Sequence, residues 1–589
     1  MNLLYAVQNE TYKAVRGFED LAQIKRDLSE KCIALTAVKN QSAAFQVVFF
    51  SGEDFLLSVA GSTGFDKSGM IPAVRLAPEP ASFGGITGSM NILGFVEDDD
   101  MLQKADILLN DENVHVEKRK LQPVWVEYPV PEAAEPGVYE GVLGIYLHTG
   151  FGPEERIGEV AFSIDVRDIT LPAPEDYAFY LDLWQHNANI ARKHEVKLWS
   201  DRHFEIIENY VASLSGLGQK AISVIASEIP WSGQFGFKAT SNLSDLYEYN
   251  MIRVFKDAGG KLGLDFGAVD RYIDLCFKYG IKEEIELFGL LNIWVSPEEG
   301  FGKVIDGLSD SIRVRYLDLR DNRYYYIDNA DDLKSYISAI EKHFINRGLI
   351  DRVRIIADEP ADPEETNKRL EFLAEAAPSL KYKVALAHAE FLDAELPENI
   401  VDFVPVIFAI GNRLDRYIDI RKKTGGKVCW YVCCTPDIPN TFIKSYLLES
   451  WFIGWFTEYI GFDGFLRWNY TVWPENPRQS LRYRAHVFPA GDMNFVYPSP
   501  SGGPLLSLRY KALLRGIQIF ELLNMLKKAG GNAGELIAKA REKIFRFKSI
   551  DVFQADNNRR FGELASIEYR DHAEALDIIL RAIAVKDEE

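Results

Sequence analysis

The most constraining feature of the sequence is a series of eight short apolar segments between residues 173 and 500, separated by stretches with helical spacing. Short buried strands that alternate with helices are typical of a parallel sheet with crossover helices. Eight such units predict a (β/α)8 barrel of the TIM type, and a doubly wound open sheet is the alternative. The expected strands are Phe179–His186, Ala221–Ala226, Ile285–Trp294, Val353–Asp358, Tyr382–His388, Phe403–Phe408, Val428–Cys433 and Phe465–Tyr470.

The segments on either side of the predicted barrel have different patterns, so we expect a multidomain chain. Residues 1–172 alternate apolar and polar residues with period two, as in Glu159–Arg167, which predicts an antiparallel β-sandwich. Leu171–Pro174 contains two prolines and predicts a stiff linker. Residues 501–589 have helical spacing and predict C-terminal helices packed on the barrel. Arg313–Tyr326 alternates charged and aromatic residues and predicts a hairpin inserted in the barrel.

The charge balance argues against several classes of partner. The chain has 66 Lys and Arg against 87 Asp and Glu, a formal charge of -21 that repels nucleic acid and anionic lipid surfaces. The stretch Met1–Val7 lacks the features of an export signal, and the apolar stretch Tyr446–Phe456 is too short to cross a bilayer. Five cysteines fit a reducing compartment. We expect a cytoplasmic protein with neither a nucleic-acid partner nor integral membrane contact, and we predict no oligomeric state.

Two adjacent acids, Asp358 and Glu359, end the fourth predicted strand and precede Pro360. Barrel active sites lie at the carboxyl ends of the strands. Two carboxyls after an apolar run would be costly inside a core, so we expect both to face an opening. Pro360 favours an extended backbone at Glu359, where successive side chains diverge. The alternative is the start of a surface helix, where acidic residues are also common.

The adjacency of the two acids suits one type of glycoside hydrolysis. Ordinary retaining glycosidases place two carboxyls on opposite sides of the scissile bond, whereas enzymes for 2-acetamido sugars can use the carbonyl of the substrate as the nucleophile. In the second scheme Glu359 is the general acid, with a pKa raised by burial or by the neighbouring charge. Asp358 stays ionised, accepts the acetamide N–H and stabilises the oxazolinium ion.

Aromatic and polar residues at the strand ends are further candidates for substrate binding. An acetamide methyl group requires an apolar cage, a carbonyl oxygen requires a donor such as a Tyr hydroxyl, and a sugar face requires a flat ring. Core packing is the alternative for each aromatic residue, and an ordinary buried hydrogen bond or a loop cap is the alternative for the polar ones. The candidates are Trp184, His186, Asn187, Trp430, Tyr431, Trp468, Asn469, Trp473 and Asp492.

No motif predicts a metal or a cofactor. Cys429, Cys433 and Cys434 lie on or just after one predicted strand, without a second Cys/His pair at zinc-ligand spacing. These cysteines are therefore interpreted as small apolar residues.

Several of these segments together resemble glycoside hydrolase family 123. The resemblance runs in order across most of residues 120–525 and implies a β-sandwich followed by a catalytic barrel. It also implies β-N-acetylgalactosaminidase activity by substrate assistance, on a neutral glycan or a glycolipid headgroup, with the paired acids of the family at Asp358 and Glu359. The matching segments are Leu181–His186, Asp358–Pro360, Gly464–Tyr470, Gly491–Asp492, Tyr497–Pro498 and Ser507–Arg509.

Two functional alternatives remain open from the sequence. One is a barrel that binds carbohydrate without catalysis and keeps its aromatic residues for recognition. The other is a glycosidase for a different sugar, such as β-N-acetylglucosamine or a sugar without an acetamido group. The galacto and gluco sugars differ in one axial hydroxyl, whose partners the sequence does not place.

Overall fold

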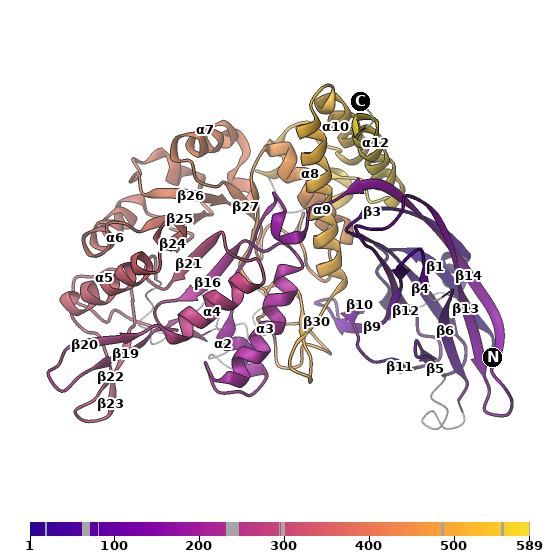
Figure 1. Ribbon diagram of the computed structural model, residues 1–589, viewed down its shortest axis with the longest axis horizontal. Coiled ribbons are helices and arrows are strands. Elements are labelled where there is room, and N and C mark those ends of the chain that lie inside the picture. Colours follow the sequence, from indigo (N-terminus) through magenta and orange to yellow (C-terminus); the bar gives the residue numbers. More distant parts are fainter. Residues whose placement is uncertain are drawn as a thin grey trace.

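The structure is a computed structural model that describes residues 1–17, 21–61, 71–80, 82–230, 247–293, 295, 301–483, 488–554 and 559–587. A β-sandwich lies at one end of the molecule and an α/β unit at the other (Figure 1). Helices from the last quarter of the chain lie between them.

The N-terminal domain is a sandwich of two six-stranded sheets, in the region where the sequence predicts it. Its core is formed by apolar side chains that alternate along the strands, such as Val160, Phe162, Ile164 and Val166. Most strand pairs are antiparallel as expected, but β14 pairs with β3 and β5 pairs with β6 in parallel. In order, the sheets are β1 (Leu3–Asn9), β4 (Gln41–Ser51), β12 (Gln122–Val130), β9 (Ser89–Glu97), β10 (Gln103–Leu108) and β2 (Val15–Arg16), and β11 (Asn113–Val116), β5 (Phe55–Ser58), β6 (Ala73–Glu79), β13 (Gly137–His148), β14 (Glu155–Thr170) and β3 (Cys32–Lys39).

The α/β unit contains all eight predicted strands, and each is parallel to its neighbours. Five form one sheet and three form another. Isolated parallel bridges join the two sheets at both edges, Leu181 with Gln219 and Phe403 with Val428, so the eight strands close into a ring. The strands are β15 (Tyr180–Leu183), β16 (Ala221–Ile225), β21 (Glu284–Phe288), β24 (Val353–Asp358), β25 (Lys381–Leu386), β26 (Ile400–Pro405), β27 (Cys429–Tyr431) and β28 (Gly464–Arg467).

Helices cover the outside of the ring, as a (β/α)8 barrel requires. Only the connection from β25 to β26 lacks an α-helix and has the short 3-10 helix η6 (Ala389–Asp393) instead. The other crossovers are α3 (Asp201–Ser215), α4 (Gly267–Lys278), α5 (Ala330–Asn346), α6 (Pro363–Ala376), α7 (Leu414–Thr424) and α8 (Leu447–Ile460), and the short α2 (Asn187–Lys193) follows β15.

A small sheet is inserted in the loops that follow β16 and β21. Its four strands lie at one edge of the barrel (Figure 1), and the antiparallel pair of β22 and β23 falls within the predicted hairpin Arg313–Tyr326. The strands are β20 (Leu262–Asp265), β19 (Arg253–Lys256), β22 (Arg315–Asp318) and β23 (Arg323–Tyr326).

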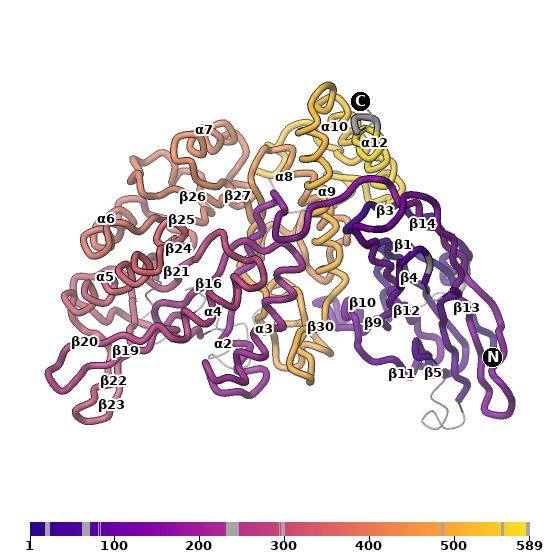
Figure 2. The backbone as a smooth tube through the Cα atoms, in the orientation of Figure 1, coloured from indigo at the N-terminus to yellow at the C-terminus, as the bar shows by residue number. Residues whose placement is uncertain are grey.

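The C-terminal helices share one core with the barrel and contact the sandwich as well. Helix α9 packs against α8 so closely that a Cβ added at Gly454 would lie 1.9 Å from the carbonyl oxygen of Gly516. The chain then returns to the sandwich (Figure 2), where Arg167 of β14 pairs with Asp577 at 3.3 Å. Arg509 of α9 also reaches Asp106 of the sandwich at 3.0 Å. The helices are α9 (Leu508–Ala529), α10 (Ala533–Ile544), α11 (Phe561–Leu564) and α12 (Tyr569–Asp587).

Candidate active site

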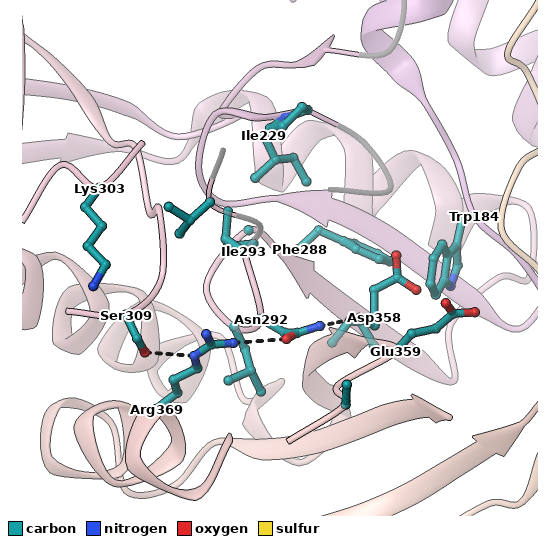
Figure 3. A pocket seen from close by; sticks show the side chains of 16 residues that line it. Trp184, Ile229, Phe288, Asn292, Ile293, Lys303, Ser309, Asp358, Glu359 and Arg369 are labelled. Atoms are coloured by element: carbon teal, nitrogen blue, oxygen red, sulfur yellow. Dashed lines mark hydrogen bonds between the residues drawn. The ribbon is translucent and has the colours of Figure 1, made fainter. Parts of the chain in front are cut away.

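A cavity of about 340 Å³ opens at the carboxyl ends of β15, β21 and β24. Asp358, the last residue of β24, and Glu359 both line it. Both carboxyl groups point toward the indole of Trp184, which follows β15 (Figure 3). The wall is otherwise largely apolar and includes Ile229 and Phe288. The two acids therefore face one shared space, as expected for residues at the mouth of a barrel.

The backbone at Glu359 differs from the sequence expectation. Its φ is +49°, in the left-handed region, whereas Pro360 favours an extended conformation. The Glu359 N–H donates to the carbonyl oxygen of Ala385 on β25 at 3.0 Å, and the Asp358 carbonyl oxygen accepts from the Asn292 amide. These contacts between distant segments override the local preference and turn the Glu359 side chain back toward the cavity.

The charge arrangement of the pair also differs from the sequence interpretation. Burial, together with the nearby charge of Glu359, raises the pKa of the Asp358 carboxyl well above its usual value. The sequence interpretation gave the raised pKa to Glu359 instead. Asp358 and Phe288 both line the cavity, whose largely apolar wall solvates the charged form of Asp358 poorly.

Tyr431 joins the pair from β27, three strands along the ring. Its hydroxyl donates a hydrogen bond to Oε1 of Glu359. Burial and the charge of Glu359 raise the pKa of Tyr431 well above its usual value, so the hydroxyl keeps its proton and remains a donor. Of the predicted binding residues, Tyr431 contacts the acids directly, and Trp184 lines the cavity beside them, with its ring centroid 5.0 Å from that of Phe288.

Trp430 and Trp473 lie in the core and do not line the cavity. The Trp430 indole N–H donates to Thr457 of α8 at 2.8 Å, and its ring packs edge-on against Phe465. The Trp473 N–H donates to the carbonyl oxygen of Val496 at 2.7 Å. Strand ends are crowded by the covering helices, so an aromatic residue there can point outward as readily as inward. We therefore do not retain these two residues as substrate ligands.

His186 and Asn187 lie just beyond Trp184, where helix α2 begins. Both are buried, and neither lines the cavity. Desolvation lowers the pKa of His186 to about 3, so this imidazole is neutral at physiological pH. The Asn187 carbonyl oxygen accepts from Nε2 of His203 at 2.9 Å. These residues support the start of α2.

Trp468, Asn469 and Asp492 form part of a buried polar cluster next to β28. Arg467 donates to Oδ1 of Asp492 at 2.8 Å, and both side chains are fully buried. The Trp468 indole also donates to this carboxyl, at 3.3 Å. Within the described part of the chain, neither amide atom of Asn469 has a hydrogen-bond partner, although the residue is fully buried. The cluster does not line the cavity.

We expect Asp492→Asn to lower the free energy of unfolding by about 2–3 kcal/mol, because it removes the countercharge of the buried Arg467. Burial raises the pKa of Asp492 to about 6, so the pair is ionised at neutral pH. Asp437, whose exposed carboxylate pairs with Lys444 at 2.9 Å, provides the control. Asp437→Asn should cost less than about 1 kcal/mol in the same urea titration. Equal costs for the two variants would contradict a structural role of Asp492.

The sequence interpretation missed several residues that line the cavity, notably Asn292, Ile229 and Arg369. Asn292 lay inside the predicted strand Ile285–Trp294, but β21 ends at Phe288, and Trp294 itself is outside the described residues. The glycine at position 289 was the sequence signal that the strand stops there. In the structure Gly289 has a φ of +97°.

Comparison with known proteins agrees with this architecture. Residues 184–526 match the model described as "Glycoside hydrolase 123, catalytic domain", and residues 95–146 match that of the "Glycoside hydrolase 123 N-terminal domain". The first match covers over half of the 589 residues. The chain belongs to glycoside hydrolase family 123. A search of curated proteins found no match.

Among solved structures, a family 123 glycoside hydrolase from Clostridium perfringens, studied for glycolipid glycan hydrolysis, matches with a TM-score of 0.73. The identity is 17%, over 100% of this chain and 98% of that one, so the likeness concerns the fold. A broad-specificity GH5-4 endoglucanase from Clostridium longisporum reaches only a TM-score of 0.29, at 12% identity over 53% of this chain and 85% of that one. This family 123 chain is thus a glycoside hydrolase with the domain order of its family.

Metal sites and membrane spans are two further features that the described residues could contain. No group of three or more His, Cys, Asp or Glu side chains in those residues is placed to hold a metal ion. Among the same residues, no helix combines the length and apolar character that a membrane span requires.

Proposed function

We propose that this family 123 chain is a retaining glycosidase that releases terminal β-linked N-acetylgalactosamine by substrate assistance. The observation that carries the proposal is the composition of the cavity wall. Among the described residues that line it, Asp358 and Glu359 are the only carboxyls. An ordinary retaining mechanism needs a second carboxylate across the scissile bond from the acid. Two neighbouring acids on one side leave the nucleophilic role to the acetamide oxygen of the substrate.

The acetamide group is proposed to bind at Asp358. The ionised carboxylate accepts the N–H of the acetamide and directs its carbonyl oxygen to the anomeric carbon. As the C–O bond to the leaving group breaks, the new C–O bond closes the oxazolinium ring, whose positive charge lies beside Asp358. Water then opens the ring on the face from which the aglycone left, so the configuration of the sugar is retained.

Glu359 is proposed as the general acid and base. It gives its proton to the leaving oxygen in the first step and takes a proton from water in the second. Burial and the nearby charge of Glu359 raise the pKa of Asp358, so the Asp358 carboxyl binds a proton readily before substrate enters the cavity. A bound acetamide N–H stabilises the charged form of Asp358, which leaves the proton on Glu359, where the reaction requires it. The Tyr431 hydroxyl, which donates to Glu359 in the absence of substrate, is proposed to turn its single proton to the acetamide oxygen once Glu359 is protonated.

The substrate is proposed to be a neutral glycan or glycolipid headgroup. The Trp184 ring beside the acids and the apolar residues Ile229 and Phe288 suit a sugar face and an acetamide methyl group. The similar clostridial enzyme was studied for glycolipid glycan hydrolysis, which supports the same class of substrate here. A non-catalytic binding role is less compatible with two acids that face a cavity, because half-buried carboxyls are costly for stability when they have no role in the reaction.

The experiment compares nitrophenyl β-glycosides of N-acetylgalactosamine and N-acetylglucosamine, with the anomer first released identified by NMR. We expect the galacto substrate to be cleaved faster and the β-anomer to appear first. A faster gluco reaction would reassign the sugar but keep the mechanism. Release of the α-anomer would contradict retention. Binding of either sugar by calorimetry, with no release over long incubation, would support the non-catalytic alternative.

A further inference from the structure

The peptide group that joins the two acids is held from both sides. Its N–H, from Glu359, donates to the carbonyl oxygen of Ala385 at 3.0 Å. Its carbonyl oxygen, from Asp358, accepts a hydrogen bond from Nδ2 of Asn292. The plane of this peptide fixes the directions in which both side chains leave the backbone. The groups that hold the peptide therefore set where the two carboxyls point.

Asn292 lies in the loop after β21 and is itself held by two residues, Arg369 and Asp310. Nη1 of Arg369, on α6, donates to Oδ1 of Asn292 at 3.0 Å, and Nε of the same guanidinium donates to Ser309 at 2.8 Å (Figure 3). The carboxyl of Asp310, which is 2% exposed, accepts the backbone N–H of Asn292 at 3.2 Å and lies 3.3 Å from Arg369. The backbone of Asn292 has a φ of +55°, which asparagine tolerates better than most residues.

The chemistry of these contacts requires an amide at position 292. A guanidinium can only donate and a peptide carbonyl can only accept. The residue between Arg369 and the Asp358 carbonyl must therefore accept on one side and donate on the other. Aspartate could accept from Arg369 but has no proton to donate, and an apolar residue could do neither. The partners therefore show which end of the Asn292 amide is the oxygen and which is the nitrogen: the oxygen faces Arg369 and the nitrogen faces the Asp358 carbonyl.

We propose that Asn292, fixed by Arg369 and Asp310, is a positioning residue for the catalytic pair. It holds the peptide between Asp358 and Glu359 in the left-handed turn that brings both carboxyls into the cavity. This proposal rests on the proposed function of the pair. It adds that residues which do not themselves react, in the loop after β21 and in α6, set the positions of the two carboxyls. The separate roles of Asp358 and Glu359 depend on those positions.

Asn292→Gly tests the role of the side chain. Glycine adopts positive φ without strain, so the variant removes the amide and leaves the backbone conformation accessible. We expect kcat on the substrate that the wild-type protein hydrolyses to fall between about tenfold and a hundredfold, with KM changed less than about threefold, because small misplacements of reacting groups cost this much. Asn292→Asp, which keeps the size and the Arg369 contact but loses the donor, should lose a similar factor.

Asn322→Gly is the matched control. Asn322 also has a left-handed backbone, with φ +57°, and lies exposed in the turn between β22 and β23, away from the acids. This variant makes the same chemical change and should keep the wild-type kcat. The pH dependence of kcat/KM is a second readout. When the two carboxyls leave their wild-type positions, the charge of Glu359 should raise the pKa of Asp358 less. The acid limb of kcat/KM should therefore move to lower pH in Asn292→Gly and stay in place in Asn322→Gly.

A crystal structure of Asn292→Gly separates failure of this proposal from failure of the proposed function. We expect the peptide between Asp358 and Glu359 to rotate and the two carboxyls to leave their wild-type positions. Carboxyls that superpose on those of the wild-type protein, together with an unchanged kcat and pH profile, would overturn the positioning role. The proposed function would instead fail if Asp358→Asn and Glu359→Gln both kept full activity. In that case the structure of Asn292→Gly still decides whether the amide holds the peptide.

Discussion

Asp358→Asn is expected to lower kcat by about 10²–10³-fold on a nitrophenyl N-acetyl-β-galactosaminide. The amide has nearly the shape of the carboxylate, but it carries no charge to stabilise the oxazolinium ion and can present an NH₂ group to the acetamide N–H. The loss should appear in kcat and in kcat/KM together, because the missing interaction develops in the transition state. Steady-state kinetics at several pH values measures both quantities.

The fold of Asp358→Asn should be at least as stable as that of the wild-type protein at neutral pH. Burial raises the pKa of Asp358 in the folded state, so the folded protein binds its proton more tightly than the unfolded chain does. Stability of the wild-type protein therefore falls as pH rises from the ordinary Asp pKa, about 3.9, through the raised value. Asp358→Asn has no ionisable carboxyl at this position, so its stability does not fall with pH in this way. A variant that unfolds more readily than the wild-type protein at neutral pH would show that Asp358 serves the fold.

Glu359→Gln is expected to lose about 10²–10⁴-fold in kcat on a disaccharide whose leaving group is a poor one, since glutamine cannot protonate the departing oxygen. The loss should be much smaller on a dinitrophenyl glycoside, whose leaving group departs without a proton. This dependence on the leaving group distinguishes the acid from Asp358, whose replacement should slow both substrates alike. Equal losses for Glu359→Gln on the two substrates would contradict the role of general acid.

The architecture could be predicted from the sequence because its main elements have local patterns. Each barrel strand is a short apolar run, and the ends of β24 agree with the predicted segment Val353–Asp358. The alternation in β14 likewise predicts a strand with one buried face. The prediction failed where apolar residues continue past the end of a strand. Leu290 and Leu291 are buried in the loop after β21, so their pattern alone could not show where the strand stops.

The details of the site were less accessible because they depend on contacts between distant segments. Glu359 adopts its left-handed turn through Ala385 and Asn292, which lie 26 and 67 positions away in the sequence. No local sequence pattern predicts such contacts. The position of the two acids after a strand did predict a cavity at their side, since parallel strands end on the same face of a barrel. The indole of Trp430 was misplaced because strand ends do not reveal which way a side chain faces.

Wild-type kinetics on N-acetyl-β-galactosaminides whose acetamide methyl group carries increasing numbers of fluorine atoms would test most directly whether the substrate supplies the nucleophile. Fluorine withdraws electrons from the carbonyl oxygen and weakens its attack on the anomeric carbon. If Asp358 and Glu359 act on one sugar in the way proposed, kcat/KM should fall steeply with each added fluorine. A rate that is independent of fluorination, or equally fast cleavage of a β-galactoside without the acetamide, would show that the protein itself supplies the nucleophile.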